Sequence, residues 1–191
     1  MIVFIVLVTL LILYIAYENH TRNKELLKYA QTDALTGLYN KETTEQLTDE
    51  LLSEDENKSH AFLILDVDCF KQINDIYGHA VGDIVLQKFG KLLKGTFREG
   101  DILGRIGGDE FGVIMKNIQT KDIAMKKAGE LLAKTQAYKI DELKGNNISI
   151  SIGISTAPQD GDCYMDLYKR ADQALYQAKR SGKARVCNYF S

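Results

Sequence analysis

The sequence has little net charge and few cysteines, and each shortage excludes a class of protein. Its 191 residues contain 24 lysines and arginines against 26 aspartates and glutamates, so it lacks the basic surface that a nucleic-acid polymer needs, and any nucleotide ligand should be small. The three cysteines are scattered and form no CxxC pair, which argues against disulfides and structural zinc and fits a reducing compartment. The remaining composition, 45% hydrophobic and 26% charged, is typical of one globular domain with an appendage.

The first 17 residues, MIVFIVLVTLLILYIAY, carry no charged side chain. A helix of this length spans about 25 Å, the short end of what crosses a bilayer, so we expect a transmembrane helix over residues 1–17. The alternatives are a signal peptide, whose basic start and small-residue cleavage site are not evident, and a buried core helix, which usually shows a polar stripe. Basic residues follow the segment and none precedes it, which predicts a single pass with the C-terminal domain in the cytoplasm.

A short polar segment, residues 18–31, separates this apolar run from the rest of the chain. It permits a helix with Leu26, Leu27 and Ala30 as a narrow apolar stripe, and it could form a two-stranded coiled coil, although it is too short to establish one. Turn-forming residues follow in TDALTGLYNK. We therefore expect a linker helix over 18–31 and the main domain over 32–191.

The main domain alternates helical and strand patterns. Residues 61–68, AFLILDVD, are apolar on both faces and indicate a central strand, whereas residues 147–156, NISISIGIST, alternate strictly and indicate another. Helices are expected over 41–53, 70–78, 82–97, 121–137 and 164–183, and a hairpin over 101–115. This order predicts an α+β fold with a mostly antiparallel sheet flanked by helices.

Two pairs of acidic residues lie where strands end. Asp66 and Asp68 close the central strand, and because side chains alternate along a strand, both should point to one face. Two buried carboxylates repel and are costly to desolvate unless a cation neutralises them. Asp109 and Glu110 occupy the hairpin tip, where in isolation they would be a solvated turn. If the hairpin pairs beside the central strand, Asp66 and one of them converge as oxygen ligands suited to Mg²⁺.

Further residues could hold a nucleoside triphosphate. Lys71 follows the central strand at the start of a helix, whose backbone N–H groups favour an anion. Asn74 and Asp83 flank the turn DIYGHAVG, where an amide and a carboxylate together could pair with guanine. Lys179 and Lys183 lie one helical turn apart and could reach the triphosphate, although a lysine on a late helix is usually only solvated.

Five segments taken in order, DALTGLYNK, DVDCFKQINDIYGHAVGD, RIGGDEFGVIM, SISIGIS and ADQALYQAKRSGKARV, resemble the sequential signatures of GGDEF-domain diguanylate cyclases. The resemblance covers residues 33–186 and implies the fold of class III nucleotide cyclases and polymerase palms. It also implies that a homodimer condenses two GTP molecules into cyclic di-GMP, at the bacterial cytoplasmic membrane if the N-terminal segment spans it. The alternative is a catalytically silent module that binds GTP or cyclic di-GMP, although such modules usually lose a carboxylate that this chain keeps.

The resemblance implies roles for individual residues. The implied metal ligands, for Mg²⁺ with Mn²⁺ as an alternative, are Asp66, the Val67 carbonyl, Asp109 and Glu110. The implied substrate ligands are backbone N–H groups and polar side chains at Cys69, Phe70, Lys71, Asn74, Asp83, Lys179 and Lys183. Asp109 would also take the 3′-hydroxyl proton, while Glu110 and Lys71 would assist catalysis.

The resemblance also implies an inhibitory site for the product. Arg98 and Asp101 match the RxxD pattern at its usual distance before the GGDEF turn, with Arg105 as a third member. The alternative is that Arg98 and Asp101 form a surface ion pair without function. Two positions depart from the family, because Lys183 and Lys41 stand where arginine is frequent, and the first change loses a bidentate phosphate contact.

Overall fold

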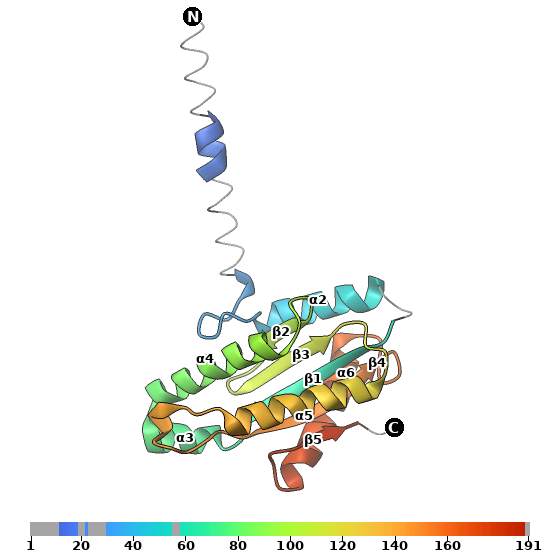
Figure 1. Cartoon of the computed structure of the whole chain (residues 1–191). Helices are drawn as coiled ribbons and strands as arrows, with labels where there is room; N and C mark the ends of the chain where they lie inside the picture. The colour runs from blue at the N-terminus through green and yellow to red at the C-terminus, as the bar shows by residue number, and fades with distance from the viewer. Residues whose placement is uncertain (1–11, 19–21, 23–29, 55–57, 190–191) are drawn as a thin grey trace, which may run out of the picture.

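The computed structural model describes residues 12–18, 22, 30–54 and 58–189 (Figure 1). The helices of the main domain are α2 (Lys41–Glu54), α3 (Phe70–Tyr77), α4 (His79–Thr96), α5 (Lys121–Ala137) and α6 (Tyr164–Arg180), and a short 3₁₀ helix, η1, spans Asp141–Leu143. The strands are β1 (His60–Val67), β2 (Ile102–Arg105), β3 (Glu110–Met115), β4 (Ile150–Ala157) and β5 (Val186–Asn188). The expected helices and strands are therefore present, and η1 and β5 are additions.

The five strands form one sheet in the order β2-β3-β1-β4-β5. β1 pairs antiparallel with both β3 and β4, which confirms its expected central position, and β2 and β3 form the expected hairpin. β5 instead pairs parallel with β4, so the sheet is mixed. This parallel pairing is possible because α6 ends at Arg180 rather than at the expected 183, which leaves residues 181–185 to turn the chain back so that β5 can run along β4.

Alternate residues of the strands build two hydrophobic layers, one on each face of the sheet. Leu63 and Leu65 of β1 pack with the apolar stripes of α4 and α5, and Phe62 and Ile64 pack with residues of α2 and α6. In Figure 1, α4 and α5 cross the near face of the sheet and α6 lies behind it. Each large apolar side chain buried in this way stabilises the fold by about 1.5–3 kcal/mol. The ends of the strands are therefore anchored in a well-packed core.

The backbone of α6 approaches β4 closely at Gly153. A Cβ atom at this position would collide with the Ala171 carbonyl and the backbone of Leu175, so only glycine fits. This close packing fixes the distance between α6 and the sheet. It thereby fixes the position of Lys179 in the last turn of the helix.

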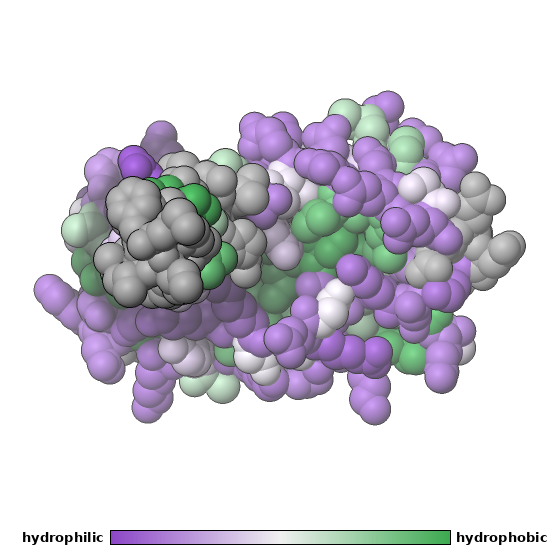
Figure 2. All heavy atoms as spheres, turned by 90° about the horizontal axis from the view of Figure 1, so that it is seen from above, coloured by the Kyte–Doolittle hydropathy of each residue, from purple (hydrophilic) through white to green (hydrophobic). Residues whose placement is uncertain are grey.

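The edge strand β2 is partly covered by the segment that precedes α2. The Tyr39 N–H donates to the Leu103 carbonyl at 3.0 Å, and the Tyr39 carbonyl accepts from the Arg105 N–H at 2.8 Å. Segment 30–40 is therefore attached to the sheet through its backbone. On this side of the molecule, seen from above, apolar side chains gather in the middle and polar side chains surround them (Figure 2).

The expected transmembrane helix and linker fall largely outside the described residues. Residues 12–18 are helical, and among the residues that the structure describes no helix is long and apolar enough to cross a bilayer. The assignments of 1–17 and 18–31, and the domain boundary at 32, stay predictions.

Candidate active site

Three acidic residues gather at one end of the β1/β3 pair. In this antiparallel register Asp66 lies opposite Glu110, and the Val67 N–H donates to the Asp109 carbonyl at 3.2 Å. Asp66 is buried, whereas Asp109 and Glu110 are partly exposed. The expected convergence of Asp66 with the hairpin tip is confirmed, and Glu110 is the residue directly across from it.

The carboxylates of this cluster repel one another, and one ammonium group lies beside them. Lys179 Nζ is 2.7 Å from Asp66 Oδ2. Burial raises the pKa of Asp66, and Asp109 and Asp68 raise it further, while Lys179 lowers it. Burial also raises the pKa of Glu110, with a second contribution from Asp66. Both groups hold protons more tightly than in water, because burial and the neighbouring carboxylates together outweigh the effect of Lys179.

This surplus of negative charge suits a hard divalent cation. Carboxylate and carbonyl oxygens are the ligands that Mg²⁺ prefers, and the backbone register brings the residues predicted as its ligands to one end of the β1/β3 pair: Asp66, Val67, Asp109 and Glu110. The ammonium group of Lys179 forms an ion pair with Asp66, which shows that this point stabilises positive charge. The residues present therefore fit Mg²⁺ or Mn²⁺.

Asp68 has a different environment, although it lies only two residues beyond Asp66. Its Oδ1 accepts a hydrogen bond from Ser151 Oγ at 2.7 Å, and its Oδ2 accepts bonds from Ser149 Oγ at 2.8 Å and the Ala184 N–H at 3.1 Å. These three donors stabilise the negative charge without a metal. The expectation that the two aspartates together require a cation therefore does not hold for Asp68, which instead binds the loop after α6.

That loop carries Lys183 to the start of α3. Lys183 has a positive φ of 61°, and its Nζ lies 3.1 Å from the Sγ of Cys69, the residue before α3. Phe70 and the exposed Lys71 follow in the first turn of that helix. Of the predicted phosphate ligands, Cys69, Phe70, Lys71 and Lys183 thus lie at one helix start, whereas Lys179 pairs with Asp66. Lys183 reaches it from the loop rather than from α6, which corrects the expected helical spacing from Lys179.

The two residues predicted to read guanine lie on either side of the turn between α3 and α4. Asn74 is half-buried on α3, and its amide lies where a side chain on Gly82 would project. Asp83 follows Gly82 on α4 and is exposed. Gly78 makes the turn with a positive φ of 87°, a conformation that glycine adopts readily. The structure therefore brings Asn74 and Asp83 to one corner of the molecule.

Arg105 contacts the acidic hairpin turn and does not line the cavity that holds Arg98. Its guanidinium donates to the Gly108 carbonyl at 2.7 and 3.1 Å and lies 3.1 Å from Asp33 Oδ2. Burial alone would raise the pKa of Asp33, but hydrogen bonds from Thr36 and the charge of Arg105 lower it. Sequence analysis missed this link because its two partners lie 72 residues apart. The available signal was an aspartate in TDALTG and an arginine just before the glycine pair.

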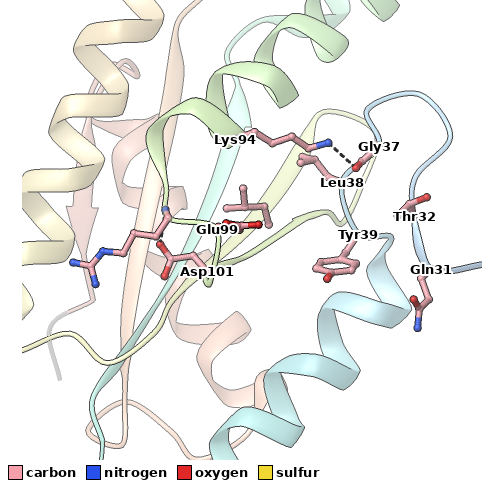
Figure 3. A pocket seen from close by; sticks show the side chains of 10 residues that line it. Gln31, Thr32, Gly37, Leu38, Tyr39, Lys94, Glu99 and Asp101 are labelled. Atoms are coloured by element: carbon pink, nitrogen blue, oxygen red, sulfur yellow. Dashed lines mark hydrogen bonds between the residues drawn. The ribbon is translucent and has the colours of Figure 1, made fainter. Parts of the chain in front are cut away.

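Arg98 and Asp101 line a cavity of about 720 Å³ beside segment 30–40. Figure 3 shows side chains of that segment and of the α4–β2 region around it, with Lys94 Nζ bonded to the Gly37 carbonyl at 2.8 Å. The Asp101 carboxylate accepts hydrogen bonds from the backbone N–H groups of Arg98 and Lys116. Within the described residues it forms no ion pair with the Arg98 guanidinium, so the alternative of a simple surface ion pair does not apply.

Comparison with known proteins identifies a family and relatives that this chain resembles. The family described as "Diguanylate cyclase, GGDEF domain" matches residues 30–185. Diguanylate cyclase A of Treponema denticola is 37% identical over 171 residues, which cover 86% of this chain and 46% of that protein. The chain thus spans about half the length of this relative.

Solved structures agree with this assignment. The GGDEF domain of TpbB (YfiN) from Pseudomonas aeruginosa has a TM-score of 0.79 at 33% identity, over 83% of this chain and 94% of that one. The coiled coil and GGDEF domain of DgcB from Caulobacter crescentus, in complex with c-di-GMP, has the same fold, with a TM-score of 0.83 at 24% identity over 91% and 93% of the two chains. With its acidic hairpin turn placed against the central strand, the chain belongs to the GGDEF-domain family of diguanylate cyclases.

Proposed function

We propose that this chain condenses two GTP molecules into cyclic di-GMP and releases two pyrophosphates. The observation that carries the proposal is the cluster at the β1/β3 end, where Asp66 faces Glu110 beside Asp109, with Lys179 as a counter-charge. Buried and crowded carboxylates are costly for folding, and such perturbed groups cluster at functional sites. The family match and a relative that is named a diguanylate cyclase support the same reaction.

In the proposed reaction the 3′-oxygen of each GTP attacks the α-phosphorus of the other, so the following bond changes occur twice and release two pyrophosphates. The bond between O3′ and the α-phosphorus forms, the bond from the α-phosphorus to the pyrophosphate oxygen breaks, and the 3′-hydroxyl proton passes to Asp109. Lys71 and Lys183 stabilise the charge on the phosphates and on the leaving pyrophosphate. Lys179 holds the triphosphate tail, and Asn74 and Asp83 hold the base.

A divalent cation belongs to this proposal as a cofactor. When bound, Mg²⁺ or Mn²⁺ would stabilise negative charge on the phosphate oxygens as a Lewis acid. Asp66, the Val67 carbonyl, Asp109 and Glu110 would hold it. The chain itself supplies the binding of base and phosphates and the acceptor for the proton.

The active unit in this proposal is a homodimer. Cyclic di-GMP is two-fold symmetric, and each half contributes one 3′-oxygen and one α-phosphate. One chain that holds one GTP supplies only half of this, so two chains must face each other about a two-fold axis. Residues 18–31 would raise the local concentration of partners as a coiled coil, and residues 1–17 would anchor the dimer in the bacterial cytoplasmic membrane.

The cavity beside segment 30–40 is the proposed site of product inhibition. An arginine fork suits both phosphate and the guanine edge, and a carboxylate suits the N–H donors of guanine. Arg98 and Asp101 supply these groups at the cavity wall. Arg105 would act indirectly, through its bonds to the catalytic turn.

The test of the function is product formation by the purified chain with GTP and Mg²⁺. We expect cyclic di-GMP and pyrophosphate, with a specific activity that rises with protein concentration and with a fused dimeric coiled coil. If a folded chain at high concentration yields no product, the proposed activity is rejected. GTP and cyclic di-GMP binding assays would then examine the silent-module alternative.

A further inference from the structure

Gly82 is a glycine within the first turns of a long helix. It lies in α4, which runs from His79 to Thr96, and its backbone is helical, with no positive φ. In such a position glycine is less favourable than alanine. Backbone conformation therefore gives no reason for a glycine here, and the reason must lie in what surrounds it.

The space beside Gly82 is occupied by the side chain of Asn74. A Cβ atom at position 82 would overlap with Asn74 Oδ1, and it would lie 3.1 Å from Asn74 Cγ and 3.2 Å from Phe70 Cζ. Any side chain larger than hydrogen would thus displace the amide of Asn74. Phe70 would also have to shift, since 3.2 Å is closer than carbon atoms normally pack.

Among the described residues, the half-buried side chain of Asn74 has no hydrogen-bond partner that would fix its orientation. None of the residues of α3, the described helix that carries it, is fully buried. The amide of Asn74 therefore does not rest in a core. The amide of Asn74 packs instead against α4, in the space that the missing side chain of Gly82 leaves open.

We infer that Gly82 is a positioning residue for base recognition, which holds the amide of Asn74 in the orientation that meets the guanine edge. The inference rests on the proposed function, in which Asn74 and Asp83 read guanine. It adds a third residue, one that contacts no substrate and acts through Asn74. Replacement of Gly82 by a larger residue should weaken GTP binding by about tenfold, which is the effect of losing about one hydrogen bond.

The first experiment compares two glycine substitutions in the same helix. Gly82→Ala displaces Asn74, whereas Gly95→Ala projects into open space, with nothing within 4 Å. The readouts are the dissociation constant of a non-hydrolysable GTP analogue in the presence of Mg²⁺, and KM and kcat for GTP. Gly82→Ala should raise the dissociation constant and KM about tenfold and lower kcat less. Gly95→Ala should match the wild type.

The second experiment places Gly82→Ala in an Asn74→Ala background, where the amide is absent and Phe70 Cζ is the remaining close neighbour of the new Cβ atom. If Gly82 acts through Asn74, the substitution should have little further effect there. Equal weakening in both backgrounds, or a Gly82→Ala protein that binds like Gly95→Ala, would overturn the inference alone. A folded wild type that neither binds the analogue nor forms product would overturn the proposed function and this inference with it.

Discussion

Asp66 and Asp68 lie two residues apart at one strand end, yet their surroundings differ in kind. Asp68 accepts hydrogen bonds from two serine hydroxyls and a backbone N–H. Asp66 has one ammonium partner and faces the acidic Glu110 across the strands. The protein thus provides hydrogen-bond donors for the carboxylate of Asp68, whereas it places the carboxylate of Asp66 among other negatively charged groups. That contrast separates a structural aspartate from one placed for chemistry.

The raised pKa values of Asp66 and Glu110 have a consequence for folding. A carboxyl group whose pKa is raised in the folded protein binds its proton more tightly there than in the unfolded chain. Its contribution to the free energy of unfolding therefore falls as the pH rises from the unfolded pKa through the folded one. Without a divalent cation, the cluster should destabilise the fold at neutral pH relative to mildly acidic pH.

The largest expected effect is the loss of activity in Asp109→Asn. The change keeps the size of the side chain and removes the charge and the proposed proton acceptor, so kcat should fall by about a thousandfold or more. Product assays measure the loss, and circular dichroism checks that the protein remains folded. Substantial residual activity would move the metal and proton roles to Glu110.

Asp68→Asn should act on substrate binding through the loop after α6. The amide has one acceptor oxygen where the carboxylate has two, so it cannot accept at both oxygen positions at once, and the loop that carries Lys183 should loosen. We expect KM for GTP to rise about tenfold and the free energy of unfolding to fall by about 2 kcal/mol. Ser151→Ala, which removes one of the three bonds, should cost less. An unchanged KM would separate Asp68 from the phosphate site.

A smaller effect is expected at the link between segment 30–40 and the catalytic turn. Arg105→Lys loses the fork that joins the Gly108 carbonyl to Asp33, so kcat should fall severalfold while the fold remains. A double-mutant cycle with Asp33→Asn should show a coupling of about 1 kcal/mol in stability. Strictly additive effects would mean that the two residues act independently.

The smallest expected effect concerns product inhibition. Asp101 is bonded to the backbone N–H of Arg98 rather than to its side chain, so Arg98→Ala should leave the loop geometry intact. Initial rates against added cyclic di-GMP should show inhibition of the wild type and relief in the mutant. Equal inhibition of both proteins would place the product in the active site instead.

Local patterns predicted much of the fold because the periodicity of apolar residues indicates the type of element, although every residue of β4 is buried. The apolar run of β1 and the alternation of β4 indicated two strands, and the convergence of Asp66 with the hairpin followed once antiparallel pairing was assumed. The role of Asp68 did not follow, because its donors lie 81, 83 and 116 residues away. β5, with three residues, is too short for any periodicity. Its place depends on where α6 ends.

The contrast between the two aspartates is tested most directly by the free energy of unfolding in metal-free buffer at neutral pH. Asp66→Asn removes a charge that the fold disfavours, and Lys179 is exposed enough to be solvated without its partner. Asp68→Asn removes a charge that three donors stabilise. We expect Asp66→Asn to be at least as stable as the wild type and Asp68→Asn to be less stable. Similar losses in both variants would contradict this expectation.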